Sequence, residues 1–343
     1  MNKQTKRYIN NLHQDSRKMK YLLDRGLTIE SIKKFGIGLS LCKNQEVHYL
    51  LVEKNININN GLLQKNGNNL YPFFANRLMI PFRSIENMRV IGFTARDIHS
   101  IDREYLAEQE IKKRDYLKIK NIDLAKYKNS MESKNFKKNE YLYNLNGVVS
   151  SSAIIFESQL NAIACDQLQR QGVSFEVEGV HTAPHPIATG GTSLTEKHID
   201  VLLGRGIRNI TLCFDGDRAG IRATKMAIEM LFKRKEIISV SVISMPKNTD
   251  LMDLIRTPKK IKNLVSKIRF AEQWLCDFYE YQEREFNKKN KSMKVFIDWW
   301  TNSQKYNKYN LLREFEFTVG AINIELSPVV GGSTFHAFLN KSL

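Results

Sequence analysis

The sequence predicts an α/β protein with three parts: an α+β N-terminal lobe over residues 1–150, a parallel sheet flanked by helices over residues 151–257, and a C-terminal helical subdomain over residues 258–343. The length of 343 residues predicts two or three compact units, because domains usually hold about 100–200 residues. Hydrophobic residues make up 42% of the chain, which is enough for a packed core. After residue 150, short apolar runs alternate with longer helical patterns, as in βαβ proteins.

The first elements of the N-terminal lobe are two short helices predicted within Ser16–Phe35. The apolar run YLL precedes Gly26, which is typical of a helix end, and Thr28 begins a second amphipathic stretch. Arg25 lies at the turn between them, where a solvated surface cation is the simplest interpretation of the pattern alone.

A β-hairpin is predicted next, between Leu70 and Asp97. The runs NRLMIPF and RVIGF have strand character, and the polar sequence SIENM separates them. Strand side chains alternate between faces, so Arg77 and Arg83 are expected on one face of the first strand, and Arg96 just past the end of the second.

Two further features of this hairpin suggest a ligand. Asn76 precedes Arg77, and Gly92 precedes Phe93, and both pairs indicate that something anionic approaches the backbone closely. A solvated sheet face explains the arginines equally well. The hairpin alone therefore leaves anion binding and a plain polar surface as alternatives.

The segment Glu104–Asn146 interleaves lysines with tyrosines, as in KKRDYLKIKN and NFKKNEYLYNLN. This mixture suits phosphate contacts combined with base stacking. A solvated loop is the alternative, because Lys and Asn are frequent throughout the chain. The serine run that follows, Ser150–Ser152, is the predicted joint between domains.

The second part of the chain has the pattern of a parallel sheet covered by helices. The predicted strands are Ala153–Phe156, Ile210–Phe214 and Val240–Ile243, and the predicted helices are Leu160–Leu168 and Ala219–Phe232. From about Pro258 the pattern is helical and rich in aromatic residues.

Composition limits the partners of the chain. Subtracting 36 acidic from 53 basic residues gives a net charge of +17, which favours nucleic acid or another polyanion. No apolar stretch is long enough for a membrane span, and the start of the chain does not resemble a signal peptide, so no membrane partner is expected. The four cysteines lie far apart, which excludes a cysteine-only zinc ribbon and indicates a reducing, cytoplasmic compartment.

Acidic residues follow each predicted strand of the parallel sheet. The loops after successive parallel strands meet at one edge, so these carboxylates are expected close together. Carboxylates that gather in this way suit Mg²⁺ or Mn²⁺ bound together with substrate phosphates. The predicted ligands are Glu157, Asp215, Asp217, Asp250 and Asp253.

Several segments resemble, in order, the catalytic core of bacterial DnaG-type DNA primases, whose catalytic domain is the TOPRIM domain. Within the sheet these are Glu157, the run ATGGTSLTEKHIDVL and the run TLCFDGDRAGIRA. Upstream, YLLDRGLTIESIKKFGIG resembles the start of that core, FANRLMIPFR and RVIGFTARDI its basic lobe, and FKKNEYLYNLN the segment before TOPRIM. The resemblance covers roughly Tyr21 to Pro258.

The resemblance implies a DNA primase, a nucleotidyltransferase that joins ribonucleoside triphosphates into short RNA primers on single-stranded DNA by two-metal chemistry. It implies that Glu157, Asp215 and Asp217 are catalytic and that they bind the metal ions with Asp250. It also implies that basic-lobe residues face nucleotide or template, namely Arg25, Asn76, Arg77, Arg96, Tyr116 and Lys138. A replicative helicase is the expected protein partner.

The chain departs from the family pattern at three positions. Asn161 replaces an acid of the E-G-x-x-D motif, Met252 replaces the second acid of D-P-D, and Asp115 stands where a basic residue usually precedes Tyr-Leu. Asp253 is the candidate substitute for the acid missing at Met252. The family's N-terminal zinc-binding domain has no counterpart in the cysteine spacing, so no zinc is predicted, and a short, phage-like catalytic core is expected.

Two other functions remain as alternatives. TOPRIM domains also occur in nucleases and topoisomerases, where the same acids support strand cleavage. Because two acids of the family pattern are replaced, a non-catalytic template-binding or helicase-associated replication factor is the second alternative.

Overall fold

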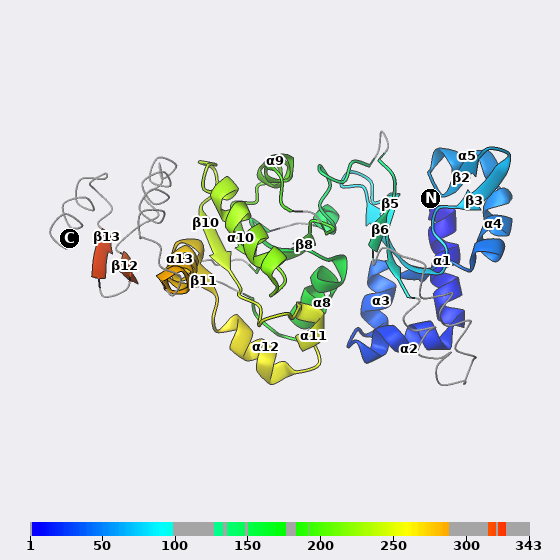
Figure 1. Ribbon diagram of the computed structural model, residues 1–343. Helices are drawn as coiled ribbons and strands as arrows, with labels where there is room; N and C mark the ends of the chain where they lie inside the picture. Colours follow the sequence, from blue (N-terminus) through cyan, green and yellow to red (C-terminus); the bar gives the residue numbers. More distant parts are fainter. Residues whose placement is uncertain are drawn as a thin grey trace. The chain divides into compact units, whose positions relative to one another are not determined.

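The computed structural model describes residues 2–98, 127–132, 136–147, 150–175, 183–191, 193–287, 315–319 and 322–326. The chain divides into two compact units, drawn in Figure 1. One comprises residues 1–148 and 158–171, and the other residues 149–157 and 172–343. Helix α8, Gln159–Arg170, therefore belongs to the first unit, although it follows the first strand of the second.

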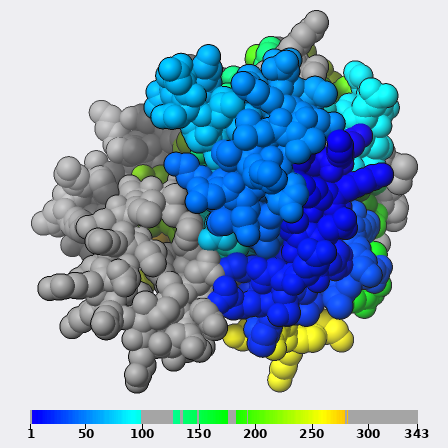
Figure 2. Space-filling model, turned by 90° about the vertical axis from the view of Figure 1, so that its right-hand side faces the viewer, coloured from blue at the N-terminus to red at the C-terminus, as the bar shows by residue number. Residues whose placement is uncertain are grey.

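Short helices open the first unit, and two of them have side-chain caps. They are α1 Asn2–Gln14, α2 Ser16–Asp24, α3 Ile29–Phe35, α4 Lys43–Leu51 and α5 Lys54–Asn59. The side chain of Asp15 accepts a hydrogen bond from the Lys18 amide, and that of Thr28 from the Ser31 amide, so each cap satisfies a backbone donor at a helix start. The two helices predicted within Ser16–Phe35 are confirmed. Atoms of these N-terminal helices, blue in Figure 2, form a continuous layer on one face.

An antiparallel sheet lies against these helices, with the strand order β1-β4-β5-β6. Its strands are β1 Gly38–Leu39, β4 Arg77–Arg83, β5 Val90–Asp97 and β6 Tyr127–Asn129. The predicted hairpin is confirmed as β4 and β5. A second hairpin that the sequence analysis did not predict pairs β2, Leu63–Asn66, with β3, Asn69–Pro72.

Two expectations about the hairpin of β4 and β5 were wrong. Arg96 does not follow the second strand: β5 continues through Asp97, which pairs with Arg77. Gly92 is approached closely by protein, because a Cβ atom there would lie 3.2 Å from ring carbons of Phe136 and 3.3 Å from Cβ of Ser130. The space at Gly92 is thus filled by an aromatic side chain of the same unit.

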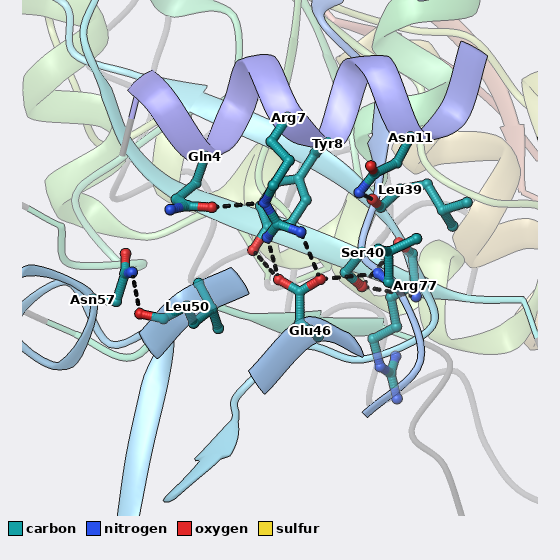
Figure 3. Close-up of polar contacts among 11 residues, drawn as sticks. Gln4, Arg7, Tyr8, Asn11, Leu39, Ser40, Glu46, Leu50, Asn57 and Arg77 are labelled. Carbon is teal, nitrogen blue, oxygen red and sulfur yellow. Dashed lines mark hydrogen bonds and ion pairs between the residues drawn. The ribbon is translucent and has the colours of Figure 1, made fainter. Parts of the chain in front are cut away.

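A buried ion pair joins the first helix to α4 (Figure 3). Both oxygens of the fully buried Glu46 carboxylate accept from the Arg7 guanidinium. The Tyr8 hydroxyl donates to Oε1 of Glu46 at 3.0 Å, and the Leu41 amide donates to Oε2 at 2.9 Å. Burial and the neighbouring Glu46 charge raise the pKa of Tyr8, which stays protonated as a donor. With its lone pairs satisfied, Glu46 is tolerated in the interior.

The second unit contains a five-stranded sheet with the order β11-β10-β9-β7-β8. Its strands are β7 Ser152–Phe156, β8 His185–Ala188, β9 Asn209–Leu212, β10 Ser239–Val242 and β11 Arg269–Phe270. The first four run parallel, and β11 adds an antiparallel edge. The three strands predicted from sequence are confirmed as β7, β9 and β10, whereas β8 and β11 were not predicted.

Helices follow the strands of this sheet, as Figure 1 shows for α10 beside β10. They are α9 Glu196–Gly204, α10 Arg218–Leu231, α11 Leu251–Leu254, α12 Pro258–Val265 and α13 Ala271–Asn287. Helix α10 buries one side through Thr224, Ala227 and Leu231, in agreement with its predicted amphipathic pattern. None of the helices in the described part of the chain is both long and apolar enough to cross a membrane.

The prediction of a wholly helical C-terminal part was wrong at the edge strand β11 and again after residue 314. Strands β12, Phe315–Val319, and β13, Ile322–Leu326, form an antiparallel pair. Their sequences, FEFTV and INIEL, alternate apolar and polar residues, which is the period of a strand. Aromatic content had favoured a helix, but the period of two is the stronger local signal.

Candidate active site

Glu157 lies directly after the fully buried strand β7. Its Oε1 accepts a hydrogen bond of 3.0 Å from the backbone amide of Asp215. Burial raises the pKa of Glu157, the Asp215 amide opposes that shift, and the charge of Asp217 adds to it. The carboxylate is therefore half-buried, held by a single backbone donor, and close to a second negative charge.

A pair of glycines fixes the backbone of Glu157 from the side of β8. The amides of Gly190 and Gly191 donate to the Glu157 carbonyl oxygen at 3.0 and 2.7 Å. Both glycines have φ angles above 80°, a conformation that other residues rarely adopt. The Ala-Thr-Gly-Gly run thus has a structural explanation: it ties the end of β8 to the end of β7.

The Asp215-Gly216-Asp217 loop follows β9, and Gly216 pairs with the loop after β10. Its amide donates to the Thr249 carbonyl at 2.9 Å, and its carbonyl accepts from the Asn248 amide at 2.8 Å. A Cβ at Gly216 would lie 1.9 Å from the Pro246 carbonyl oxygen. Only glycine allows the two loops to approach this closely, and this pairing brings the acidic loops together.

Asp217 begins helix α10. Its Oδ1 accepts from the Gly220 amide at 2.8 Å, which caps the helix. A Cβ at Gly220 would lie 2.1 Å from the Asp215 carbonyl oxygen and 2.8 Å from Oε1 of Glu157. Each glycine of the FDGDRAG run is therefore required by a close contact inside the acidic site.

The third acidic loop forms a reciprocal cap at the start of α11. The Asp253 amide donates to Oδ1 of Asp250, and the Asp250 amide donates to Oδ2 of Asp253, both at 3.0 Å. Met252 is buried, so the position of the expected second acid packs into the core. Asp253 is exposed and serves the cap.

Asp250 also lies near the second acidic loop. Burial, together with the charges of Asp215 and Asp250, raises the pKa of the Cys213 thiol, which is buried at the end of β9. Cys213 is thus a buried core residue close to two acidic loops.

The described residues contain no group of three His, Cys, Asp or Glu side chains arranged to hold a metal ion. The loops carrying Glu157, Asp215 and Asp250 meet, but their carboxylates do not converge on one point. The donor chemistry nevertheless fits a hard divalent cation, because every acid present supplies oxygen ligands. The charge of Asp217 beside a desolvated Glu157 carboxylate is a cost that a cation would offset.

In the other unit, Arg77 is buried at the first position of β4. Its Nη1 donates to the Ala95 carbonyl at 3.3 Å, and burial lowers its pKa while the charge of Asp97 opposes the shift. Asn76 has a φ of 50° and donates its amide to the Leu41 carbonyl at 2.8 Å. Asn76 thus makes the left-handed bend that leads into β4.

Arg96 pairs in register with Leu78, one position from the Arg77–Asp97 pair, so Arg77 and Arg96 lie on opposite faces of the sheet. Nη1 of Arg96 donates to the Tyr127 hydroxyl at 2.6 Å, and the guanidinium lies 5.3 Å from the centre of the Tyr127 ring. The sequence analysis missed Tyr127. Tyr127 lies in a short Lys-Tyr-Lys run, which is a pattern typical of nucleic-acid contacts. This run could not be distinguished from the other Lys/Tyr pairs of the chain.

Lys128 is a second residue that the sequence analysis missed. Its Nζ donates to the Phe73 carbonyl at 2.8 Å and lies 3.7 Å from the centre of the Phe73 ring. Burial lowers its pKa, and the nearby Arg77 charge lowers it further. Lys128 and Arg77 therefore form a pair of partly desolvated cations on one face of the sheet.

The remaining predicted basic-lobe residues are Arg25, Lys138 and Tyr116. Arg25 caps α2, and its Nη1 lies 3.4 Å from the Tyr21 hydroxyl. The turn that follows Arg25 is held by Gln167 of α8, which donates to the Gly26 carbonyl and accepts from the Thr28 amide, both at 2.8 Å. Burial lowers the pKa of Lys138. Tyr116 and Asp115 lie outside the described residues.

Two protein-family models match the chain. The model described as the N-terminal domain of the DNA primase catalytic core matches residues 7–148, and the model described as Toprim-like matches residues 154–255. The DNA primase of Rickettsia felis is 32% identical over 251 residues, which cover 69% of this chain and 35% of that relative. The chain spans about a third of the length of the curated relatives it matches.

Solved structures share the fold. The E. coli primase catalytic core aligns with a TM-score of 0.62 at 23% identity, covering 82% of this chain and 83% of that one. A DnaG primase catalytic domain bound to ssDNA aligns with a TM-score of 0.61 at 23% identity, covering 82% and 81%. The α/β fold class predicted from sequence is confirmed.

Proposed function

Because this chain belongs to the bacterial DnaG-type primase family, matching it in both the N-terminal core domain and the Toprim domain, we propose that it synthesises short RNA primers on single-stranded DNA. The reaction is attack of a primer 3′-hydroxyl on the α-phosphate of a ribonucleoside triphosphate, with release of pyrophosphate. The observation that carries the proposal is the contact between Glu157 and the Asp-Gly-Asp loop at one edge of a parallel sheet. That edge is where such sheets bind their ligands.

Toprim primases are metal-dependent as a family, and Glu157, Asp215 and Asp217, with Asp250, are the proposed ligands in this chain. Mg²⁺ is the proposed ion, with Mn²⁺ as a substitute, since both take carboxylate oxygens together with substrate phosphates. When bound, such ions stabilise the negative charge that develops on the reacting phosphate and the leaving pyrophosphate. Asp253 is proposed to support Asp250 as a metal ligand, because the reciprocal cap orients both side chains.

The chain's own groups hold the reactants in this proposal. The Asp215 amide donates a hydrogen bond to the Glu157 carboxylate and so helps to orient it at the acidic edge. No protein nucleophile is needed, because the attacking group belongs to the primer, so positioning and electrostatics supply most of the catalysis.

The basic lobe is proposed to hold template and triphosphate. A related primase catalytic domain has been solved bound to ssDNA, which supports this template. Arg96, steadied by Tyr127, and the Arg77–Lys128 pair present cations whose burial strengthens their attraction for phosphate. Arg25, Asn76, Tyr116 and Lys138 complete the proposed set. A replicative helicase is the proposed protein partner, because single-stranded template arises where a helicase unwinds DNA.

A product assay tests the proposal. The chain is incubated with single-stranded templates of varied sequence, four ribonucleotides and Mg²⁺ or Mn²⁺, and labelled products are resolved by size, with Asp215→Ala as control. We expect short, template-dependent RNA that disappears in Asp215→Ala. Shortening of the template would instead identify a nuclease. Template binding without RNA, even after addition of a helicase, would favour a non-catalytic replication factor.

A further inference from the structure

A cluster of positive charge in the second unit lies on and around helix α12. The segment Arg256–Arg269 contains six basic residues and no acidic residue. The helix buries Ile261 and Leu264, and its lysines are exposed: Lys259, Lys260 and Lys262. At about 100° per residue, Lys259 and Lys262 lie on the side of the helix opposite its buried residues, and Lys260 lies beside the buried stripe.

Some cations of the same unit are paired with carboxylates, unlike the lysines of α12. Lys225 of α10 pairs with Glu229 at 2.6 Å, and Arg234, which follows α10, pairs with Glu196 and Asp200, each at 2.8 Å. Within the described part of the chain, none of the three α12 lysines has an ion pair with a carboxylate. Their charge is thus not neutralised locally.

The position of α12 connects this charge to the acidic edge. Helix α11, which begins just after Asp250, contacts α12, and only three residues separate the two helices. Pro258 fixes the first turn of α12, which sets the direction of the helix. A strand bound at the acidic loops would therefore have a positively charged surface beside it.

The chemistry of the three side chains favours a phosphate backbone. Lysine heads are mobile point charges that contact phosphates without reading bases. They rise about 4.5 Å along the helix axis from Lys259 to Lys262, so they can contact neighbouring phosphates of one strand. No aromatic residue lies among Arg256–Ile268, so base stacking is not part of this surface.

We propose that Lys259, Lys260 and Lys262 of α12 form a second nucleic-acid contact, which binds the phosphodiester backbone of a strand beside the acidic edge. This contact is separate from the basic lobe, because the lysines belong to the other compact unit. The inference rests on the proposed function, since it requires a nucleic acid at the acidic loops. An acidic protein that docks on the same lysines is the competing interpretation.

The test compares two triple variants of the full chain. Lys259→Gln/Lys260→Gln/Lys262→Gln removes the α12 charge and keeps helix propensity. Arg205→Gln/Lys233→Gln/Lys235→Gln removes three exposed cations elsewhere in the same unit. Anisotropy of labelled single-stranded DNA is measured over a salt series, primer synthesis is measured in parallel, and circular dichroism melting checks that both variants fold.

We expect the α12 variant to bind about tenfold more weakly at moderate salt, and its salt slope to be shallower by about two, since each phosphate contact on a single strand contributes about 0.7. The control variant should bind like the wild type. Equal affinity and slope in the α12 variant and the control would overturn the inference and favour an acidic protein partner. A wild type that binds but makes no primers, while the α12 variant binds weakly, would contradict only the proposed function.

Discussion

The backbone amide of Asp215 donates a 3.0 Å hydrogen bond to Oε1 of Glu157, although the two residues are 58 positions apart in the chain. They follow β7 and β9, which are adjacent parallel strands. The contact requires the chain after β9 to turn toward the end of β7. The ends of β7 and β9 are therefore packed closely together.

Gly220→Ala should lower both stability and activity. The added Cβ would lie 2.1 Å from the Asp215 carbonyl oxygen and 2.8 Å from Oε1 of Glu157, so backbone or carboxylate must move. Overpacking of this kind costs about 1–3 kcal/mol. Denaturant unfolding and primer synthesis measure the two effects.

Gly204→Ala is the matched control for this change. Gly204 lies at the last position of α9, and nothing lies within 4 Å of a Cβ built there. The same substitution should stabilise the chain by about 0.4–1 kcal/mol, because alanine reduces the conformational entropy of the unfolded chain, and it should leave activity unchanged. Equal stability of the two variants would contradict the close packing at Gly220.

Asp250→Asn and Asp253→Asn separate the two acids of the third loop. Asparagine caps helices as well as aspartate, so both variants should keep their melting temperature. If Asp250 is a ligand, Asp250→Asn should reduce the metal-dependent rate by about tenfold or more, and Asp253→Asn, which removes a neighbouring charge, by less. Wild-type rates in both variants would exclude this loop from the metal site.

Much of the acidic edge was predictable because its signals are local. Glu157 and the Asp-Gly-Asp run each follow a short apolar run, and parallel strands bring such positions to one edge. The closeness of the loops was not predictable, since it depends on the pairing of Gly216 with Thr249 across two strands.

The basic lobe was less predictable for a related reason. Cations are frequent throughout the sequence, so the pattern did not distinguish Tyr127 and Lys128 from their neighbours. Register decides their roles: Tyr127 pairs with Arg96 because β6 joins β5 at that position. Register is a long-range property that no local window contains.

Tyr127→Phe should weaken template binding through Arg96. The substitution keeps the ring near the guanidinium but removes the hydroxyl that accepts from Nη1. A hydrogen bond from a charged group is worth about 1.5–3 kcal/mol, so the affinity for single-stranded DNA should fall by roughly tenfold and by no more than about 100-fold, and by more in Arg96→Lys. Fluorescence anisotropy measures both variants.

Arg89→Lys is the control for this pair, because Arg89 is an exposed cation of the same hairpin. Its affinity should match that of the wild type. If Tyr127→Phe and Arg89→Lys bind equally well, Tyr127 does not position Arg96 for the template.

Glu272 should make stability depend on pH. Burial raises its pKa to about 7, against an ordinary value of 4.5. Between these values the folded carboxyl holds a proton that the unfolded one has lost, so unfolding releases a proton and stability falls as the pH rises. Above pH 7 the buried carboxyl is charged in the folded protein. This lowers the free energy of unfolding by about 3 kcal/mol for a pKa shift of this size.

Glu272→Gln should therefore raise the free energy of unfolding above pH 7 and flatten its decline between pH 5 and pH 7. Denaturant unfolding at several pH values measures this. Glu236→Gln, at an exposed position, should leave the pH profile unchanged. A Glu272→Gln profile that runs parallel to the wild type would contradict the burial of this carboxyl.

Glu157→Gln tests whether the acidic edge of the parallel sheet carries out nucleotidyl transfer. The glutamine keeps an acceptor for the Asp215 amide and removes the charge, so folding should be preserved. The measurement is the rate of template-directed ribonucleotide incorporation against Mg²⁺ concentration in wild type and variant. We predict a loss of at least about 100-fold in the variant, with an unchanged melting temperature. Incorporation at the wild-type rate and the wild-type metal dependence in Glu157→Gln would contradict the account.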